Sequence, residues 1–178
     1  MRVLALDTST PVTSVALVDD GAVVWEKLIE PPLKAGDVLP AALGDLAAAD
    51  AVAVGLGPGS FTGLRVGLAA AKAIAYARRL PLAGASSLQA IALDHQGLVY
   101  AATEARKHEL FVQAFRDGTP QAPVQIVMAA DFRAEPLIMA APPARNVARL
   151  CLEKLRGAAY DEAVCFSLSP DYVQGFKS

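Results

Sequence analysis

The chain has 178 residues, which is enough for one compact domain or two small lobes. Hydrophobic residues make up 54% of it, which excludes intrinsic disorder and predicts a sizeable core. The formal net charge is −2 and the basic residues are scattered, which disfavours tight, direct binding of nucleic acid. No charge-free stretch reaches the roughly 18 residues of a membrane span, and Asp7 interrupts the apolar start, so we expect a soluble cytoplasmic protein.

The cysteines and histidines do not indicate a disulfide or a metal site. Cys151 and Cys165 stand among apolar residues, as the buried thiols of cytoplasmic proteins do. His95 and His108 have no histidine, cysteine or carboxylate partner at a spacing that metal ligands use. We therefore expect a chain without a structural zinc ion and without a bound cofactor.

The N-terminal residues predict three antiparallel strands joined by tight turns. Alternating apolar residues over 3–7 end in the turn cluster Thr8-Ser9-Thr10-Pro11, and a second strand follows over 13–18. Asp19-Asp20-Gly21 is a hairpin signal, because Asp and Gly tolerate positive φ, and a third strand follows over 22–29. Such a meander is not the start of a βαβ unit.

Helices and strands alternate in the next part of the chain. Asp37 can cap a helix over 38–49, and the continuous apolar run over 51–56 predicts a buried, parallel strand. Ser60 can cap a long helix that extends to about Arg79, where a proline soon follows.

The remaining residues predict shorter elements. A strand over 82–85 precedes a short helix that begins at Ser86-Ser87 and closes at Gly97. The runs over 98–103 and 109–115 predict paired strands, followed by a turn. Beyond them the signal weakens, and the expected elements are strands over 124–127 and 137–139 and a helix over 143–155.

The segment Gly57-Pro58-Gly59-Ser60-Phe61-Thr62-Gly63-Leu64-Arg65 is the most informative stretch of the sequence. A strand, a glycine loop and a helix in this order point backbone N–H groups at an anion. The segment nevertheless lacks the lysine of a P-loop, the flanking glycines of a nucleophile elbow and the acidic residue that follows a dinucleotide fingerprint. Taken alone, it favours a tight turn with a helix cap over a phosphate site.

The helix after this loop is apolar around most of its circumference. At 100° per residue, its polar side chains fall in one narrow sector, formed by Arg65, Lys72, Tyr76 and Arg79. The apolar arc is wider than one neighbouring sheet buries, and the helix over 38–49 is similarly uncharged. We therefore predict that the two helices leave an apolar surface for another chain, beyond the contact between themselves. The predicted interface residues are Leu39, Leu43, Leu46, Gly63, Gly67, Ala70 and Ile74.

Several segments resemble the TsaB family, formerly called YeaZ. They are residues 2–10 (RVLALDTST), 57–67 (GPGSFTGLRVG), 81–88 (PLAGASSL), 104–111 (EARKHELF) and 169–173 (SPDYV). The resemblance is good over about residues 1–115 and thin over the remainder, where this chain is shorter than longer family members. TsaB is the non-catalytic companion and paralogue of the TsaD enzyme.

The resemblance implies an α/β, actin-like ATPase fold, that of the sugar kinase, Hsp70 and actin superfamily. This fold is ribonuclease H-like and combines a mixed sheet with helices in two lobes. We place an N-terminal lobe with the partner-binding helices at 1–96 and a shortened C-terminal αβ lobe at 97–178, because the best boundary signal is near Gly97.

By the same resemblance, the chain is a non-catalytic scaffold subunit of the bacterial complex that makes N6-threonylcarbamoyladenosine (t6A) at adenosine 37 of tRNA. The resemblance implies a heterodimer with TsaD through the two N-terminal helices and a TsaE ATPase near that junction. It also implies a possible homodimer when the chain is alone. Because the chemistry lies in the partner, it implies no catalytic residue, and only indirect contact with tRNA.

An independent enzyme is the alternative hypothesis. The turn after the first strand resembles the phosphate-binding hairpin of actin-like kinases, in which a carboxylate organises magnesium and backbone amides hold phosphate. In a small ATPase or kinase, or as a vestige of one, the phosphate-binding candidates are Asp7, Thr8, Ser9, Gly57 and Gly59. Against this hypothesis, no second acidic residue stands in a recognisable motif, and the shortened second lobe leaves little to close over a nucleotide.

Overall fold

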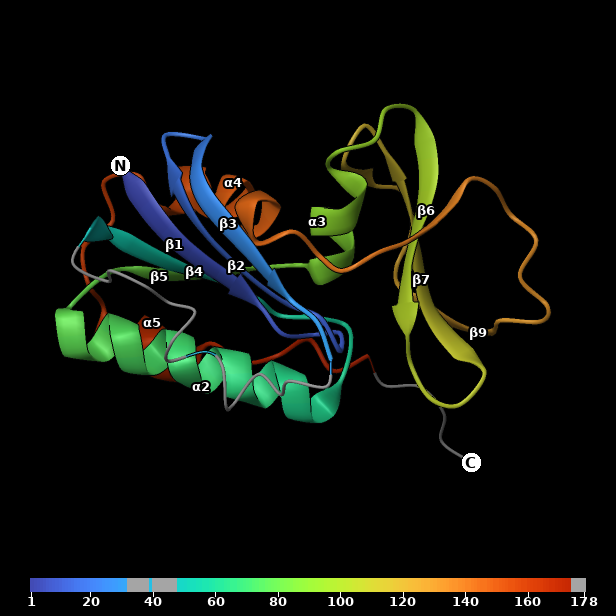
Figure 1. Cartoon of the computed structure of the whole chain (residues 1–178), viewed down its shortest axis with the longest axis horizontal. Helices are drawn as coiled ribbons and strands as arrows, with labels where there is room; N and C mark the ends of the chain where they lie inside the picture. Colours follow the sequence, from blue (N-terminus) through green and yellow to red (C-terminus); the bar gives the residue numbers. More distant parts are fainter. Residues whose placement is uncertain (32–38, 40–47, 174–178) are drawn as a thin grey trace.

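The computed structural model describes residues 1–31, 39 and 48–173. Two sheets stand side by side in it, with helices on the first sheet and between the two (Figure 1). The strand order is β3-β2-β1-β4-β5 in the first sheet and β10-β6-β7-β8 in the second, where β9 also pairs with β7.

The first sheet combines the N-terminal meander with two parallel strands. Its strands are β1 (Arg2–Asp7), β2 (Thr13–Asp19), β3 (Ala22–Ile29), β4 (Ala51–Gly55) and β5 (Leu82–Ala85). β2 pairs antiparallel with β1 and β3, whereas β4 pairs parallel with β1 and β5. The predicted meander and the predicted parallel strand are both confirmed. This order and direction of strands is the ribonuclease H-like arrangement, which confirms the expected actin-like fold class.

One long helix covers each face of the first sheet. α2 (Phe61–Arg78) lies on one face and α4 (Ala144–Leu155) on the other (Figure 1). Successive side chains of a strand point to opposite faces, so Leu4 joins the core under α2 while Val3 joins the core under α4. Both faces of β1 and β4 are therefore buried, which the continuous apolar sequence of residues 51–56 predicts for β4.

The second sheet is smaller and is joined to the first by α3 (Ser87–Ala92). Its strands are β6 (Leu98–Glu104), β7 (Glu109–Arg116), β8 (Thr119–Pro120), β9 (Gln125–Met128) and β10 (Leu137–Met139). The predicted pairing of β6 with β7 is confirmed, and the weakly indicated strands and helix after them are present.

The short helix α3 corrects one prediction, because it ends at Ala92 rather than at Gly97. Gly97, with φ of 75°, lies instead at the entrance to β6, where its N–H donates to the Asp117 carboxylate at 2.7 Å. Gly97 thus belongs to the β6–β7 hairpin of the second sheet. Its positive φ explains why a glycine occupies this position.

The C-terminal part of the chain returns to the first sheet. α4 packs on β1, β2 and β4, and the last helix, α5 (Glu162–Ser167), packs on α2. The first sheet and its helices are thus built from both ends of the chain, and the division at residues 96 and 97 stays a prediction. The predicted helix over 38–49 falls largely outside the described residues, although Leu39 itself is buried.

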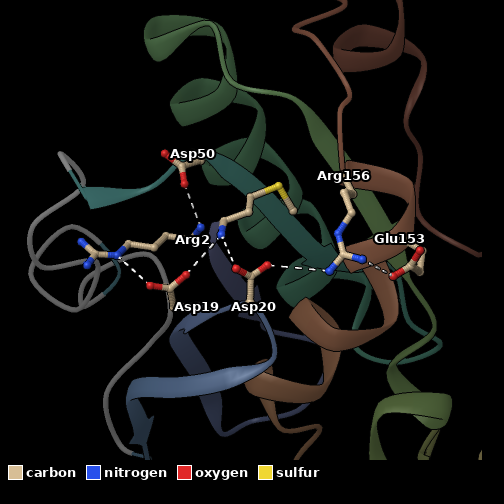
Figure 2. A network of polar contacts seen from close by, with 7 residues as sticks. Arg2, Asp19, Asp20, Asp50, Glu153 and Arg156 are labelled. Atoms are coloured by element: carbon tan, nitrogen blue, oxygen red, sulfur yellow. Dashed lines mark hydrogen bonds and ion pairs between the residues drawn. The ribbon is translucent and has the colours of Figure 1, made fainter.

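A network of charges ties the N-terminus to its neighbours at one end of the first sheet (Figure 2). The Met1 ammonium contacts Asp20 at 2.9 Å and Asp19 at 3.2 Å, and the Arg2 N–H donates to the Asp50 carboxylate at 2.8 Å. Arg156, just after α4, contacts Asp20 at 3.7 Å. These exposed contacts raise the pKa of the Met1 ammonium and lower the pKa of Asp19, but exposed pairs of this kind contribute little to stability.

Candidate functional site: the joint between the first turn and the glycine loop

The segments that follow three strands of the first sheet come together at the carboxyl ends of those strands. The turn after β1 contains Asp7, Thr8 and Ser9, the glycine loop follows β4, and Ser87 follows β5. Because β1, β4 and β5 are parallel neighbours, their carboxyl ends lie at the same edge, where ligands of open α/β sheets bind. We call the contact of Asp7, Thr8, Ser9 and Ser87 with residues 55–63 the joint.

The Asp7 carboxylate is at the centre of the joint and is fully buried. Its Oδ1 accepts hydrogen bonds from the Ser9 N–H at 2.8 Å and the Ser9 hydroxyl at 2.6 Å, and its Oδ2 accepts one from the Ser87 hydroxyl at 2.6 Å. Burial raises the pKa of this carboxyl, and the bonds from Ser87 and Ser9 offset part of that rise. Both oxygens are thus occupied by the protein itself.

The glycine loop lies so close to the turn that side chains have no room. A Cβ at Gly55 would overlap the Asp7 carboxylate, and one at Gly59 would overlap the Ser9 carbonyl oxygen. A main-chain hydrogen bond joins the loop to the turn: the Ser60 N–H donates to the Ser9 carbonyl at 2.7 Å. The Gly57 N–H donates to the Ser87 hydroxyl at 3.0 Å. The backbone donors that a phosphate would use at these two positions are therefore bonded within the chain.

Thr8 anchors the start of α2. Its hydroxyl donates to the Gly63 carbonyl at 2.7 Å, and a Cβ at Gly63 would overlap the Thr8 carbonyl oxygen. One turn later, a Cβ at Gly67 would overlap the Thr8 hydroxyl. Two glycines that the sequence suggested for a partner surface thus lie against the chain's own turn, and their role in an interface stays a prediction.

The other predicted interface residues are distributed between buried, half-buried and undescribed positions. Leu39 and Ile74 are buried and Ala70 is half-buried. Leu43 and Leu46 lie outside the described residues. The predicted phosphate-binding residues, in contrast, are brought together: Asp7, Thr8 and Ser9 meet Gly57 and Gly59 across the joint.

A cavity of about 390 Å³ opens beside the joint, toward the second sheet. Ser9, Thr10 and Ser60 line it from the first sheet, and Thr103 and Glu104 line it from the end of β6. Among the described residues that line it there is no lysine or arginine to balance a polyphosphate, and the one carboxylate is Glu104. Within the described part of the chain, no group of three or more His, Cys, Asp or Glu side chains could hold a metal ion.

Sequence reasoning missed two residues of the joint, Gly55 and Ser87. Gly55 ends β4 and makes room for the Asp7 carboxylate, and Ser87 connects that carboxylate to the glycine loop. Ser87 was predicted only as a helix start, and Ser86 is the residue that caps α3. The signal that could have found Ser87 is its place after a parallel strand next to β4, where connections of neighbouring strands meet.

Comparison with known proteins gives the same family that the motifs suggest. The family model described as "TsaD: tRNA N6-adenosine threonylcarbamoyltransferase" matches residues 37–170. The tRNA threonylcarbamoyladenosine biosynthesis protein TsaB of Escherichia coli is 37% identical over 128 residues, which are 62% of this chain and 53% of that protein. The uncharacterised protein Rv3421c of Mycobacterium tuberculosis is 34% identical over 160 residues, covering 84% of this chain and 76% of that protein.

The chain belongs to the TsaB (YeaZ) family. It spans about half the length of the E. coli TsaB that it matches. The solved structure of YeaZ from Pseudomonas aeruginosa has the same fold, with a TM-score of 0.79 and 22% identity over 97% of this chain and 99% of that chain. In this TsaB-family chain, the joint described above is formed by the segments around residues 2–10, 57–67 and 81–88, which carry the family resemblance.

We expect Gly67→Ala to destabilise the chain by roughly 1–3 kcal/mol, because the new methyl group is forced against the buried Thr8 hydroxyl. The same substitution should cost much less in a Thr8→Ala background, where that hydroxyl is gone. Urea unfolding of the wild type, both single variants and the double variant measures the coupling. Equal costs of Gly67→Ala in the two backgrounds would show that Thr8 and Gly67 do not constrain each other.

The buried Asp7 carboxyl also predicts a pH dependence. Its pKa is raised above 3.8, the ordinary value, so between that pH and its folded pKa the folded state holds a proton that the unfolded state has lost. Stability from this group is therefore present below 3.8 and is lost as pH rises through the folded pKa. The Asp7→Asn variant lacks this titration, so the unfolding free energy of the wild type should fall relative to the variant as pH rises from 3.8. A parallel pH dependence of the two proteins contradicts the burial argument.

Proposed function

We propose that this chain is a non-catalytic scaffold subunit of the complex that makes N6-threonylcarbamoyladenosine on tRNA, and that it binds and supports TsaD. The proposal follows from membership of the TsaB family, whose E. coli member is named for the biosynthesis of this modified nucleoside. A cytoplasmic location goes with this function, because tRNA is modified there. TsaE is the further partner that the family resemblance suggests.

The burial and hydrogen bonding of the Asp7 carboxylate are the observation that best supports a non-catalytic role. In an actin-like kinase the equivalent hairpin must leave a carboxylate for magnesium and backbone amides for phosphate. Here Asp7 is fully buried and bonded to Ser9 and Ser87, while the Ser60 N–H is bonded to the Ser9 carbonyl. An enzyme that used these groups would first have to break the contact that holds α2 to the sheet.

The outer side of α2 is the surface we propose for TsaD. Thr62, Ala69, Ala73 and Ala77 are exposed along this helix, and none of them carries a charge. They lie beside Ala70, a half-buried member of the predicted interface. Small, uncharged side chains allow a second helix to approach closely, and the same surface would serve a homodimer when TsaD is absent.

The experiment is an Ala73→Arg variant mixed with TsaD of the same organism. Because Ala73 is exposed, the substitution should leave the stability of the isolated chain within about 0.5 kcal/mol of the wild type. Association measured by light scattering after gel filtration should be lost, since an arginine would be buried without a partner. Gly67→Arg would not be a clean test, because Gly67 packs on Thr8 within the chain.

A matched control is Ala130→Arg, which adds the same side chain at an exposed position of the turn after β9. This control should keep full association with TsaD. If Ala73→Arg and Ala130→Arg both bind TsaD like the wild type, the proposed surface is wrong.

A further inference from the structure

A second side of α2 carries aromatic and basic residues in alternation. Arg65, Lys72 and Arg79 are seven residues apart, which places them in a sector about 40° wide and spreads them along about 21 Å of helix. Aromatic side chains from α2 and from the C-terminal segment lie among them. We call the whole group the aromatic strip; its members are Phe61, Arg65, Lys72, Tyr76 and Arg79 with Tyr160, Phe166 and Tyr172.

The aromatic rings of the strip are paired and remain accessible. Phe61 lies 5.4 Å from Tyr172 between ring centroids, and Tyr76 lies 5.9 Å from Phe166. Their exposed fractions are 54%, 47%, 54% and 64%, respectively. Two exposed aromatic pairs on one side of a monomer are more than scattered surface residues, and they indicate a binding surface.

The cations of the strip are held by rings and carbonyls. The Arg65 guanidinium lies 3.7 Å from the Phe61 ring centroid, and the Arg79 guanidinium lies 5.5 Å from that of Tyr160. The Lys72 ammonium donates to the Phe166 carbonyl at 3.0 Å. These contacts orient the three cations, and none of the contacts is with a carboxylate.

The carboxylates of the described residues do not form ion pairs with these three cations. The ion pairs of this part of the chain involve the Met1 ammonium and Arg2, Arg145, Arg149 and Arg156, several of them in the network of Figure 2. In the segment that supplies the strip's aromatics, Asp161 accepts hydrogen bonds from the start of α5, and Asp171 lines a cavity together with Gly57 and the strip residue Tyr172. Glu162 lies near Tyr160, at one end of the strip.

We infer that the aromatic strip binds a single-stranded segment of RNA, with phosphates on the three cations and bases on the exposed rings. Lines of cations with interleaved aromatic rings bind single strands in this way, because every base has a face that can stack. That the RNA is a tRNA loop rests on the proposed function. Because the net charge is −2, the isolated chain should bind RNA weakly and with a strong dependence on salt. In the assembled complex this contact would add to RNA binding by the other subunits.

The aromatic strip and the surface proposed for TsaD are neighbouring sectors of α2. At 100° per residue, Gly67 and Ile74 lie about 140° and 160° round the helix from Lys72. The exposed Ala73 lies about 100° from Lys72. Ala69, which also belongs to the surface proposed for TsaD, lies about 20° from Tyr76 and about 40° from Arg65, so a bound subunit would border the aromatic strip.

The test uses the full chain and a fluorescein-labelled oligouridine of about 12 nucleotides, a length within the usual range of single-strand sites. Fluorescence anisotropy is measured over a series of salt concentrations. Three phosphate contacts predict a slope of log K against log salt of about −2. The variant with Arg65→Gln, Lys72→Gln and Arg79→Gln should bind with a slope near zero.

A second variant separates stacking from charge. Phe166→Ala should weaken binding about tenfold without changing the salt slope, because stacking is not ionic. Arg116→Gln, which removes an exposed arginine of β7, is the matched control and should bind like the wild type. Thermal unfolding followed by circular dichroism shows that each variant is folded.

The outcomes separate this inference from the proposed function when binding to TsaD is measured on the same proteins. Absent binding of the oligouridine, or equal binding by the wild type and the triple variant, overturns the inference even if TsaD binds. Loss of TsaD from the triple variant with unchanged RNA binding makes the strip a protein surface and also overturns it. Strip-dependent RNA binding without any TsaD association supports the inference and refutes the proposed function.

Discussion

The contact between the turn after β1 and the glycine loop after β4 determines how the rest of the first sheet and α2 are arranged. Asp7 is buried there, and among the described residues its oxygens accept hydrogen bonds from Ser9 and Ser87 and form no ion pair. A buried carboxylate is tolerated only when such bonds are present, so the turn, the loop and the start of α3 must assemble together. Thr8 then fixes the first turns of α2 through Gly63 and Gly67. The glycines of the motif are required by this close approach.

This arrangement gives the sequence motif at the carboxyl ends of β1 and β4 a structural role within the chain. The residues that resemble a phosphate-binding hairpin are hydrogen-bonded within the chain, and the adjoining cavity has no basic lining residue among those described. The motif then serves to hold α2 firmly against the sheet. A rigid α2 is what a scaffold needs, because its outer side is the surface that we propose for partners.

Much of the fold could be predicted from the sequence because its signals are local. Alternation and the Asp19-Asp20-Gly21 turn located the meander, and Ser60 and Ser86 located two helix starts. The joint could be predicted only in part. Glycine is required at position 55 because Asp7 lies against it, and at position 67 because Thr8 lies against it. Both contacts join residues that are far apart along the chain, so no local sequence pattern could predict them. The helix wheel of α2 predicted burial on more than one side, whereas the buried residues occupy one sector of about 120°, and the wheel did not indicate that the turn after β1 covers the two glycines.

The most direct test of this account is calorimetric titration of the wild-type chain with ATP and Mg²⁺. If the joint is closed by its own hydrogen bonds, the titration gives no binding heat, whereas a working actin-like kinase measured alongside does. Saturable binding in the micromolar range that is lost in the Asp7→Asn variant would show that the joint opens to hold a nucleotide, and would contradict the account.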